Sequence, residues 1–239
     1  MALLGQAAMI LSFDVAAEAI AEHDDWHSHE HLPERLAIAG FRRGSRWLAL
    51  AGEPRYFVMY EVDELATLSS APYLERLNHP SPWTSKMMTH YRGMRRGLCT
   101  VFASCGAGLG RVGLLLRFAP AAGSESSLRD WLVGELMPGL PALPGVCSAH
   151  LFASALSPAM TREQGIRGND GAVDWVLLVT GYARESVARL SDEALSAARL
   201  AARQATAITS ALYQLDHALC EREVEADGAA RRLAAESPL

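Results

Sequence analysis

The sequence predicts an α+β protein made of two tandem ferredoxin-like βαββαβ units. Three observations lead to this fold class: a motif that occurs twice, the same order of strand-like and helix-like stretches around both copies, and a hydrophobic content of 50% over 239 residues. A chain of this length and composition can bury a substantial core. Because an internal repeat constrains the architecture of the whole chain, it carries more weight than any single element.

The repeated motif has the pattern W-x3-E-x2-P-x6-G. It occurs at Trp26, Glu30, Pro33 and Gly40, and again at Trp131, Glu135, Pro138 and Gly145. All four pairs are separated by 105 residues. The motif is short, so the elements around it have to support a duplication as well.

The first copy has the order strand, helix, strand, strand, helix, strand. The expected strands are residues 7–13, 41–50, 56–62 and 97–104. Apolar runs bounded by Gly, Pro and polar residues indicate these strands. The first helix carries the motif, and the second runs from about Asp63 through Tyr73 to Leu77. Residues 78–92 are rich in Pro and polar side chains, which predicts an irregular loop.

The second copy repeats this order with two differences. Its strands are expected at residues 112–118, 146–153 and 175–182, and its motif helix lies between the first two. The polar, Gly-containing residues 157–171 are expected to be a loop insertion. Apolar residues at helical spacing predict a long helix over residues 185–219. We therefore expect a first unit at residues 1–107, a degenerate second unit at 108–222 and a flexible tail at 223–239.

Each predicted unit is an antiparallel sheet with helices on one face, so its other face has to be covered. Two units in one chain can pack sheet to sheet, as two subunits of a homodimer would. A ligand site is then expected between sheet and helices, or between the two sheets. Such pseudo-dimers could pair again into a homodimer.

Charge and cysteine usage narrow the function classes. The net charge of −5 and the pI near 5.9 provide no basic patch for nucleic acid or an anionic membrane, so a small-molecule substrate is the expected partner. The four cysteines show no CxxC spacing, which favours a reducing compartment. The apolar start lacks a basic region, so we expect a buried first strand in a cytoplasmic protein and not a signal peptide.

The segment from Asp25 to Arg35 is the strongest candidate for chemistry. If it is helical, His23, His27 and His31 share one stripe, with Glu30 three residues from His27. An imidazole in an apolar pocket can accept and return a proton without a cofactor. We expect His31 and His27 to be catalytic, with Glu30 orienting the imidazole.

A solvated polar helix face is the competing interpretation of this stripe. The second copy has Leu132 and Leu136 where the first has His27 and His31. One copy thus keeps ionisable groups where the other has apolar ones. This difference suits one working site and one structural copy, although it would also arise if the first helix were exposed.

His27-x-x-Glu30-His31 also matches H-x-x-E-H, in which two His bind zinc and Glu activates water. Pro33 is expected to end or kink the helix, and such peptidases normally have far larger domains, so no metal is expected. The further substrate-binding candidates are Trp26, His90, Tyr91 and Trp83. The Gly-rich residues 105–110 are expected to link the two copies, since no helix start follows to hold a phosphate.

The motif region resembles the signature of EthD-like proteins in the dimeric α/β-barrel superfamily. The residues that carry the likeness are Trp26, His31-Leu32-Pro33 and Gly40-Phe41. Family members usually have Pro-Gly where this chain has Ala39-Gly40, whereas the second copy has Pro144-Gly145. The resemblance implies an intramolecular α/β-barrel pseudo-dimer, and it makes His31 the first polar site residue.

The superfamily that the motif resembles includes cofactor-free monooxygenases, isomerases, cyclases, dehalogenating enzymes and haem proteins, so the fold alone does not select a reaction. The leading expectation is a cofactor-independent lyase, isomerase or oxygenase that acts on a small aromatic or apolar metabolite by His-mediated proton transfer. The alternatives are a haem- or metal-binding protein and a non-catalytic small-molecule-binding module.

Overall fold

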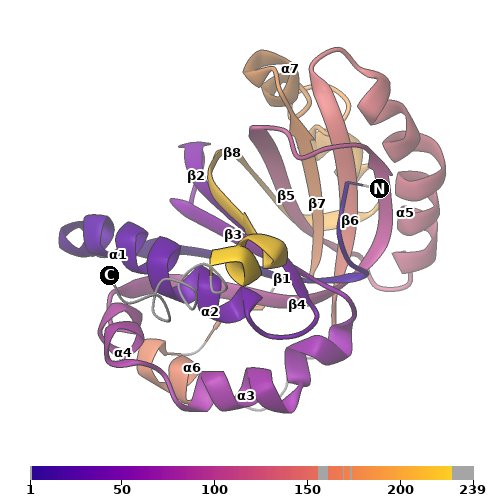
Figure 1. Cartoon of the computed structure of the whole chain (residues 1–239). Coiled ribbons are helices and arrows are strands. Elements are labelled where there is room, and N and C mark those ends of the chain that lie inside the picture. Colours follow the sequence, from indigo (N-terminus) through magenta and orange to yellow (C-terminus); the bar gives the residue numbers. More distant parts are fainter. Residues whose placement is uncertain (1, 156–160, 169, 173, 228–239) are drawn as a thin grey trace.

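The computed structural model describes residues 2–155, 161–168, 170–172 and 174–227. Eight strands of this part of the chain close into one antiparallel barrel, with helices on its outside (Figure 1). The first half contributes β1 (Ala7–Val15), β2 (Phe41–Ala51), β3 (Tyr56–Val62) and β4 (Tyr91–Gly106). The second half contributes β5 (Val112–Pro120), β6 (Val146–Ala155), β7 (Trp175–Gly181) and β8 (Ala205–Cys220).

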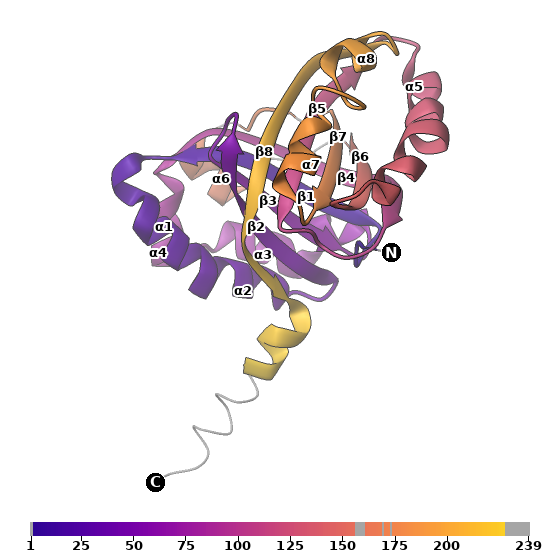
Figure 2. The same ribbon diagram turned by 90° about the horizontal axis from the view of Figure 1, so that it is seen from above.

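The two halves have the same strand order. The first is β4-β1-β3-β2 and the second is β8-β5-β7-β6, and every neighbouring pair is antiparallel. The barrel closes where β2 pairs with β8 and β4 pairs with β6. Figure 2 shows the long strand β8 running beside β2 of the first half and β5 of its own. The predicted α+β class is confirmed, as an intramolecular barrel.

The helices lie on the outer faces of the two half-barrels. The first half has α1 (Ile20–Trp26), α2 (Leu32–Leu36), α3 (Ala71–Asn78) and α4 (Pro82–Met88). The second has α5 (Glu125–Trp131), α6 (Arg162–Arg167), α7 (Arg184–Arg189) and α8 (Ala197–Ala201). Among the described residues, no helix is both long and apolar enough to cross a membrane.

Strand periodicity divides the hydrophobic residues into three cores. On β3, Tyr56, Val58 and Tyr60 belong to the core under the helices of the first half, whereas Phe57 and Met59 belong to a core inside the barrel. The barrel interior is packed with large side chains, Trp47, Phe57, Phe152 and Tyr213 among them. Of the two expected ligand locations, the space between the sheets is therefore filled by side chains. The space between sheet and helices remains as the candidate ligand location.

The motif helix of each half contains one π-helical turn. The turns span His27–His31 and Leu132–Leu136, again 105 residues apart. Proline has no N–H to donate, and its ring presses on the carbonyl four residues earlier, which a wider turn relieves. Of the two expected effects, Pro33 does not end the helix: it lies in the first turn of α2, directly after the π-helical turn.

Several element predictions are wrong. Residues 78–92 are not an irregular loop, because α4 lies within them, and 157–171 contain α6 besides positions outside the described residues. The long helix expected over 185–219 is α7, α8 and then the strand β8. Apolar residues in β8 mimic helical spacing, but they alternate: Ala211 and Tyr213 face the barrel interior, and Leu212 faces the outer core.

The tail prediction is also corrected in part. Residues 221–227 are helical, and Glu221 accepts hydrogen bonds from Arg42 at 2.7 and 2.6 Å. Val224 packs against the core of the first half. The tail therefore begins as an attached helix, while residues 228–239 lie outside the described residues.

Gly40 and Gly145 should be equally intolerant of a side chain. Their φ angles are +92° and +89°, and an added Cβ would lie 2.8 Å from Thr67 Oγ1 and 2.6 Å from Ser186 Oγ, respectively. We expect Gly40→Ala and Gly145→Ala each to lower the free energy of unfolding by about 1–3 kcal/mol in urea titrations. Gly134→Ala, whose Cβ meets nothing within 4 Å, is the control and should be neutral or stabilising. Tolerance of alanine at either turn would contradict the equivalence of the two.

Candidate functional site

A ladder of three buried histidines runs along the motif helix of the first half. His23, His27 and His31 are 0, 2 and 8% exposed. The ring centroids of His23 and His27 are 5.6 Å apart, as are those of His27 and His31. The stripe is thus not a solvated face, whereas the neighbouring His29 is 73% exposed. In the second half the equivalent Leu132 and Leu136 close the same interface with apolar side chains.

The ladder is anchored at its N-terminal end. His23 Nε2 lies 3.2 Å from the Tyr91 hydroxyl, and its Nδ1 lies 3.1 Å from a carboxylate oxygen of Asp24. The Tyr56 hydroxyl donates to the same oxygen of Asp24 at 2.8 Å. His23 is therefore fully partnered, which suits a structural role.

His27 and His31 have no such partners. The Nδ1 atom of each is buried and makes no hydrogen bond within the described part of the chain. Burial lowers the pKa of both imidazoles well below the usual 6.5, and the positive charge of Arg35 adds to this effect at His31. Both rings are therefore neutral at pH 7 and already in the form that accepts a proton.

A small cavity of about 30 Å³ lies next to His31, between the outer face of the first-half sheet and its helices. This volume holds about two water-sized groups. Met9, Leu11 and Leu77 form its apolar wall. Its polar wall comprises His31, Arg35, Tyr60, Tyr73, Arg96, Thr161, Glu163, Gln164 and Arg167.

The second half supplies one side of this cavity. Helix α6 lies beside α3 and α4 of the first half (Figure 1) and contributes Glu163 and Arg167. Glu163 forms a buried ion pair with Arg35, their side chains being 2 and 1% exposed, and Arg167 pairs with Asp170 at 2.6 Å. The inserted segment is thus part of the site and not a surface loop alone.

The structure gives Glu30 a different role from the expected one. Its carboxylate accepts hydrogen bonds from the Trp26 indole at 3.1 Å, from the Thr84 hydroxyl at 3.1 Å and from Ser81. These bonds attach α4 to the motif helix, and no described hydrogen bond joins Glu30 to an imidazole. Trp26 itself is fully buried, with its ring centroid 4.5 Å from that of His31.

The other predicted substrate contacts do not line the cavity. Tyr91 is buried and holds His23. Trp83 is partly exposed and donates to Glu22 at 3.1 Å, and the backbone oxygen of His90 accepts from Ala16. Of the predicted site residues, only His31 lies on the cavity wall, with Trp26 and His27 packed behind it.

Sequence reasoning missed most of the polar wall. Tyr60 and Arg96 occupy strand positions, and Arg96 lies in a polar stretch beside Arg95, so no local pattern marks either residue as part of a site. Glu163 and Arg167 reach the site only because α6 packs on the opposite half, which no local pattern shows. Among the described residues, no group of three His, Cys, Asp or Glu is placed to hold a metal ion.

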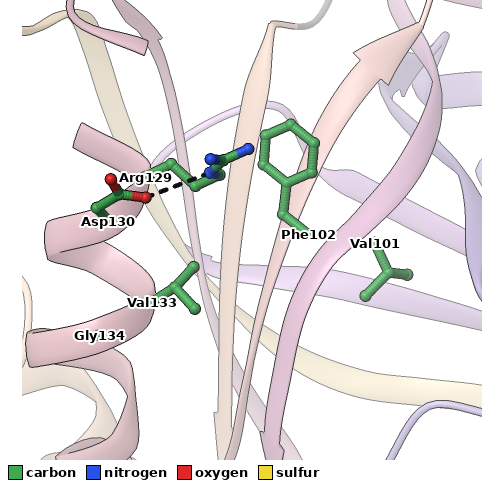
Figure 3. A pocket seen from close by; sticks show the side chains of 6 residues that line it. All are labelled: Val101, Phe102, Arg129, Asp130, Val133 and Gly134. Atoms are coloured by element: carbon green, nitrogen blue, oxygen red, sulfur yellow. Dashed lines mark ion pairs between the residues drawn. The ribbon is translucent and has the colours of Figure 1, made fainter. Parts of the chain in front are cut away.

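A second, open hollow of about 420 Å³ lies between β4 of the first half and the motif helix of the second half (Figure 3). Arg129 points toward the Phe102 ring, 5.9 Å from its centroid, and pairs with Asp130 at 3.6 Å. Both charged side chains are about half exposed or more, so the hollow offers no buried acid or base. It is a weaker candidate for catalysis than the histidine cavity.

Comparisons with known proteins reveal the fold but no close relative. No known family model matches the sequence, and no curated protein matches it. An anthrone oxidase-like protein of known structure is similar over 92% of this chain and 96% of its own, with a TM-score of 0.66 and 11% identity. A candidate monooxygenase from Lactobacillus acidophilus gives a TM-score of 0.57 and 8% identity over 90% and 96% of the two chains.

A haem-binding protein from Thermus thermophilus gives a TM-score of 0.52 and 10% identity, over 93% of this chain and 95% of its own. Identities this low establish the fold alone. The chain therefore has the dimeric α/β-barrel fold within one polypeptide. Its candidate site is a small polar cavity between the sheet and the helices of the first half, with α6 on one side.

Burial of the ladder should make stability depend on pH. The unfolded chain binds protons near pH 6.5 at histidines that the folded state keeps neutral, because burial lowers the pKa of His23, His27 and His31. Their contribution is complete above pH 6.5 and falls as the pH decreases below it, by up to ~1.4 kcal/mol per pH unit for each histidine.

Urea unfolding at about pH 7.5 and about pH 5.5 measures this slope. His27→Leu with His31→Leu, which copies the second half, should flatten the slope, whereas His29→Ala at an exposed position should leave it unchanged. An identical slope in the double variant would show that the two buried rings do not resist protonation.

Proposed function

We propose that this protein is a cofactor-independent oxygenase of an aromatic or otherwise apolar metabolite, in which His31 accepts the substrate proton. The observation that carries the proposal is the buried, unpartnered Nδ1 of a neutral imidazole on a cavity wall. A buried polar atom without a partner is unfavourable, and such atoms gather at functional sites. Loss of the proton from a carbon or hydroxyl next to an aromatic ring starts the reaction.

The names of the structural neighbours are compatible with this chemistry. One is an anthrone oxidase-like protein and another a candidate monooxygenase. In the oxidation of an anthrone, a CH2 group loses two hydrogens and gains one oxygen atom, and the second oxygen atom leaves as water. The substrate supplies all four electrons that dioxygen accepts, so the balance requires no further reductant. Lyase or isomerase reactions would begin with the same proton transfer.

One structural neighbour is named a haem-binding protein, but the cavity of this chain does not fit a haem. It has room for about two water-sized groups. A single aromatic ring already exceeds this space and requires its wall to open, and a haem exceeds it many times over. A purified sample should therefore show no Soret band.

We also propose that the two halves, residues 1–107 and 108–222, are copies of one EthD-like unit, of which only the first keeps a site. The shared strand order, the two π-helical turns and the paired Gly40 and Gly145 support the duplication. All four cysteines are free, which suits the proposed cytoplasmic setting. Pairing of two chains into a homodimer is part of the same proposal.

Oxygen uptake with anthrone and related phenols tests the function. His31→Leu, which the second half shows to fit this interface, should lower turnover by about 10²–10⁴-fold, since the proton acceptor is lost. His29→Ala should leave the rate unchanged, because His29 lies on the exposed face. An unchanged rate in folded His31→Leu would remove His31 from the mechanism.

A further inference from the structure

The charges around the cavity do not balance. Three guanidinium groups, those of Arg35, Arg96 and Arg167, line it. Arg35 pairs with Glu163 and Arg167 pairs with Asp170. Arg96 is 5% exposed, and none of the ion pairs formed by the described residues includes it. The cavity therefore carries about one uncompensated positive charge in a water-poor space.

The hydrogen bonds of Arg96 do not compensate for this charge. Its Nη2 donates to the Tyr73 hydroxyl at 3.3 Å, and its Nε lies 3.5 Å from the sulfur of Met9. Both partners are neutral, the 3.3 Å distance to the hydroxyl is long for a guanidinium, and a thioether sulfur is a weak acceptor. A buried cation with neutral partners alone is destabilising unless another group supplies negative charge.

Two further donors on the cavity wall lack acceptors. Arg35 Nη1 and the Tyr60 hydroxyl are buried and have no hydrogen-bond partner within the described residues. Each residue is 1% exposed. Burial raises the pKa of the Tyr60 phenol far above its usual value, so it remains protonated and able to donate. Arg35 and Tyr60 thus each bring an unpartnered donor to the wall of the cavity, beside the Arg96 charge that no carboxylate pairs with.

We propose that this cavity binds the negatively charged oxygen group of the ligand, a carboxylate or a phenolate, through Arg96, Arg35 and Tyr60. The inference deepens the proposed function and rests on it, because it makes the substrate an organic acid or an acidic phenol. The volume of about 30 Å³ matches the two oxygens of one carboxylate. The apolar remainder of the ligand exceeds this volume, so its binding requires the wall, which includes Met9, Leu11 and Leu77, to open around it.

Glu163 is the internal competitor of this anion. Its carboxylate occupies one side of Arg35 from the α6 helix of the other half. A ligand anion would share Arg35 with Glu163 or displace it. Neutralising Glu163 should therefore strengthen anion binding, whereas removing the Arg96 charge should weaken it.

Titration calorimetry with benzoate tests the proposal, with benzamide as the neutral control of the same shape and 4-nitrophenol as the phenolate arm. Wild-type protein should bind benzoate or nitrophenolate and not benzamide. Arg96→Met should weaken the anion at least tenfold, as expected for loss of a charged hydrogen-bond donor. Arg129→Gln removes an exposed arginine and should leave binding unchanged.

Glu163→Gln should tighten benzoate binding about tenfold, but it leaves the Arg35 charge unpaired, which can prevent folding. Arg96→Met therefore provides a second test. If the Arg96 charge is uncompensated, its removal should raise the Tm of the ligand-free protein, whereas removing a structural arginine would lower the Tm. Equal binding of benzoate and benzamide, undiminished binding in Arg96→Met, or a lower Tm for that variant would overturn the proposal.

Oxygen uptake separates this inference from the proposed function. Turnover that depends on His31 without anion binding would refute the anion site alone. Anion binding that depends on Arg96 without any turnover would refute the oxygenase alone.

Discussion

The exclusion of water from the space between the first-half sheet and its helices is the constraint on which the rest of the structure depends. Burial keeps the imidazoles of His27 and His31 neutral, and it leaves the Tyr60 hydroxyl and one nitrogen of Arg35 without partners within the described residues. The same groups on a wet surface would bond to water and titrate normally. The burial of these polar atoms, more than their residue types, keeps the imidazoles neutral and leaves the donors without partners.

The second half shows that the scaffold does not need these polar groups. It repeats the strand order and the π-helical turn, yet Leu132 and Leu136 seal its interface at 0 and 8% exposure. Apolar side chains at these positions satisfy the packing without any unpaired atom. Histidines at the matching positions are unfavourable for folding alone, and such local conflicts are expected where a site has a function.

The sequence predicted what is local and repeated. The 105-residue repeat placed the motif helices, and apolar runs placed β3 at its observed bounds. The sequence-based prediction failed for β8, where helical spacing and strand alternation coincide. It also failed for α4, where Pro82 begins a helix inside a Pro-rich stretch. The candidate site was predicted only as far as His31. Arg96 reaches the cavity through the pairing of β4 with β1, and Glu163 reaches it through the packing of α6 on the other half, and local sequence shows neither arrangement.

The positive charges of the arginines in the cavity oppose protonation of His31 as long as the ligand is neutral. Burial, and after it the charge of Arg35, lowers the pKa of His31, so the imidazole alone is a weak base. The same positive charge favours an anion beside it. Proton transfer to His31 therefore becomes favourable only when it creates a negative ligand oxygen in reach of Arg35 and Arg96. Under the proposed function this coupling would favour acidic substrates, and an inert neutral molecule in the cavity would leave His31 unprotonated.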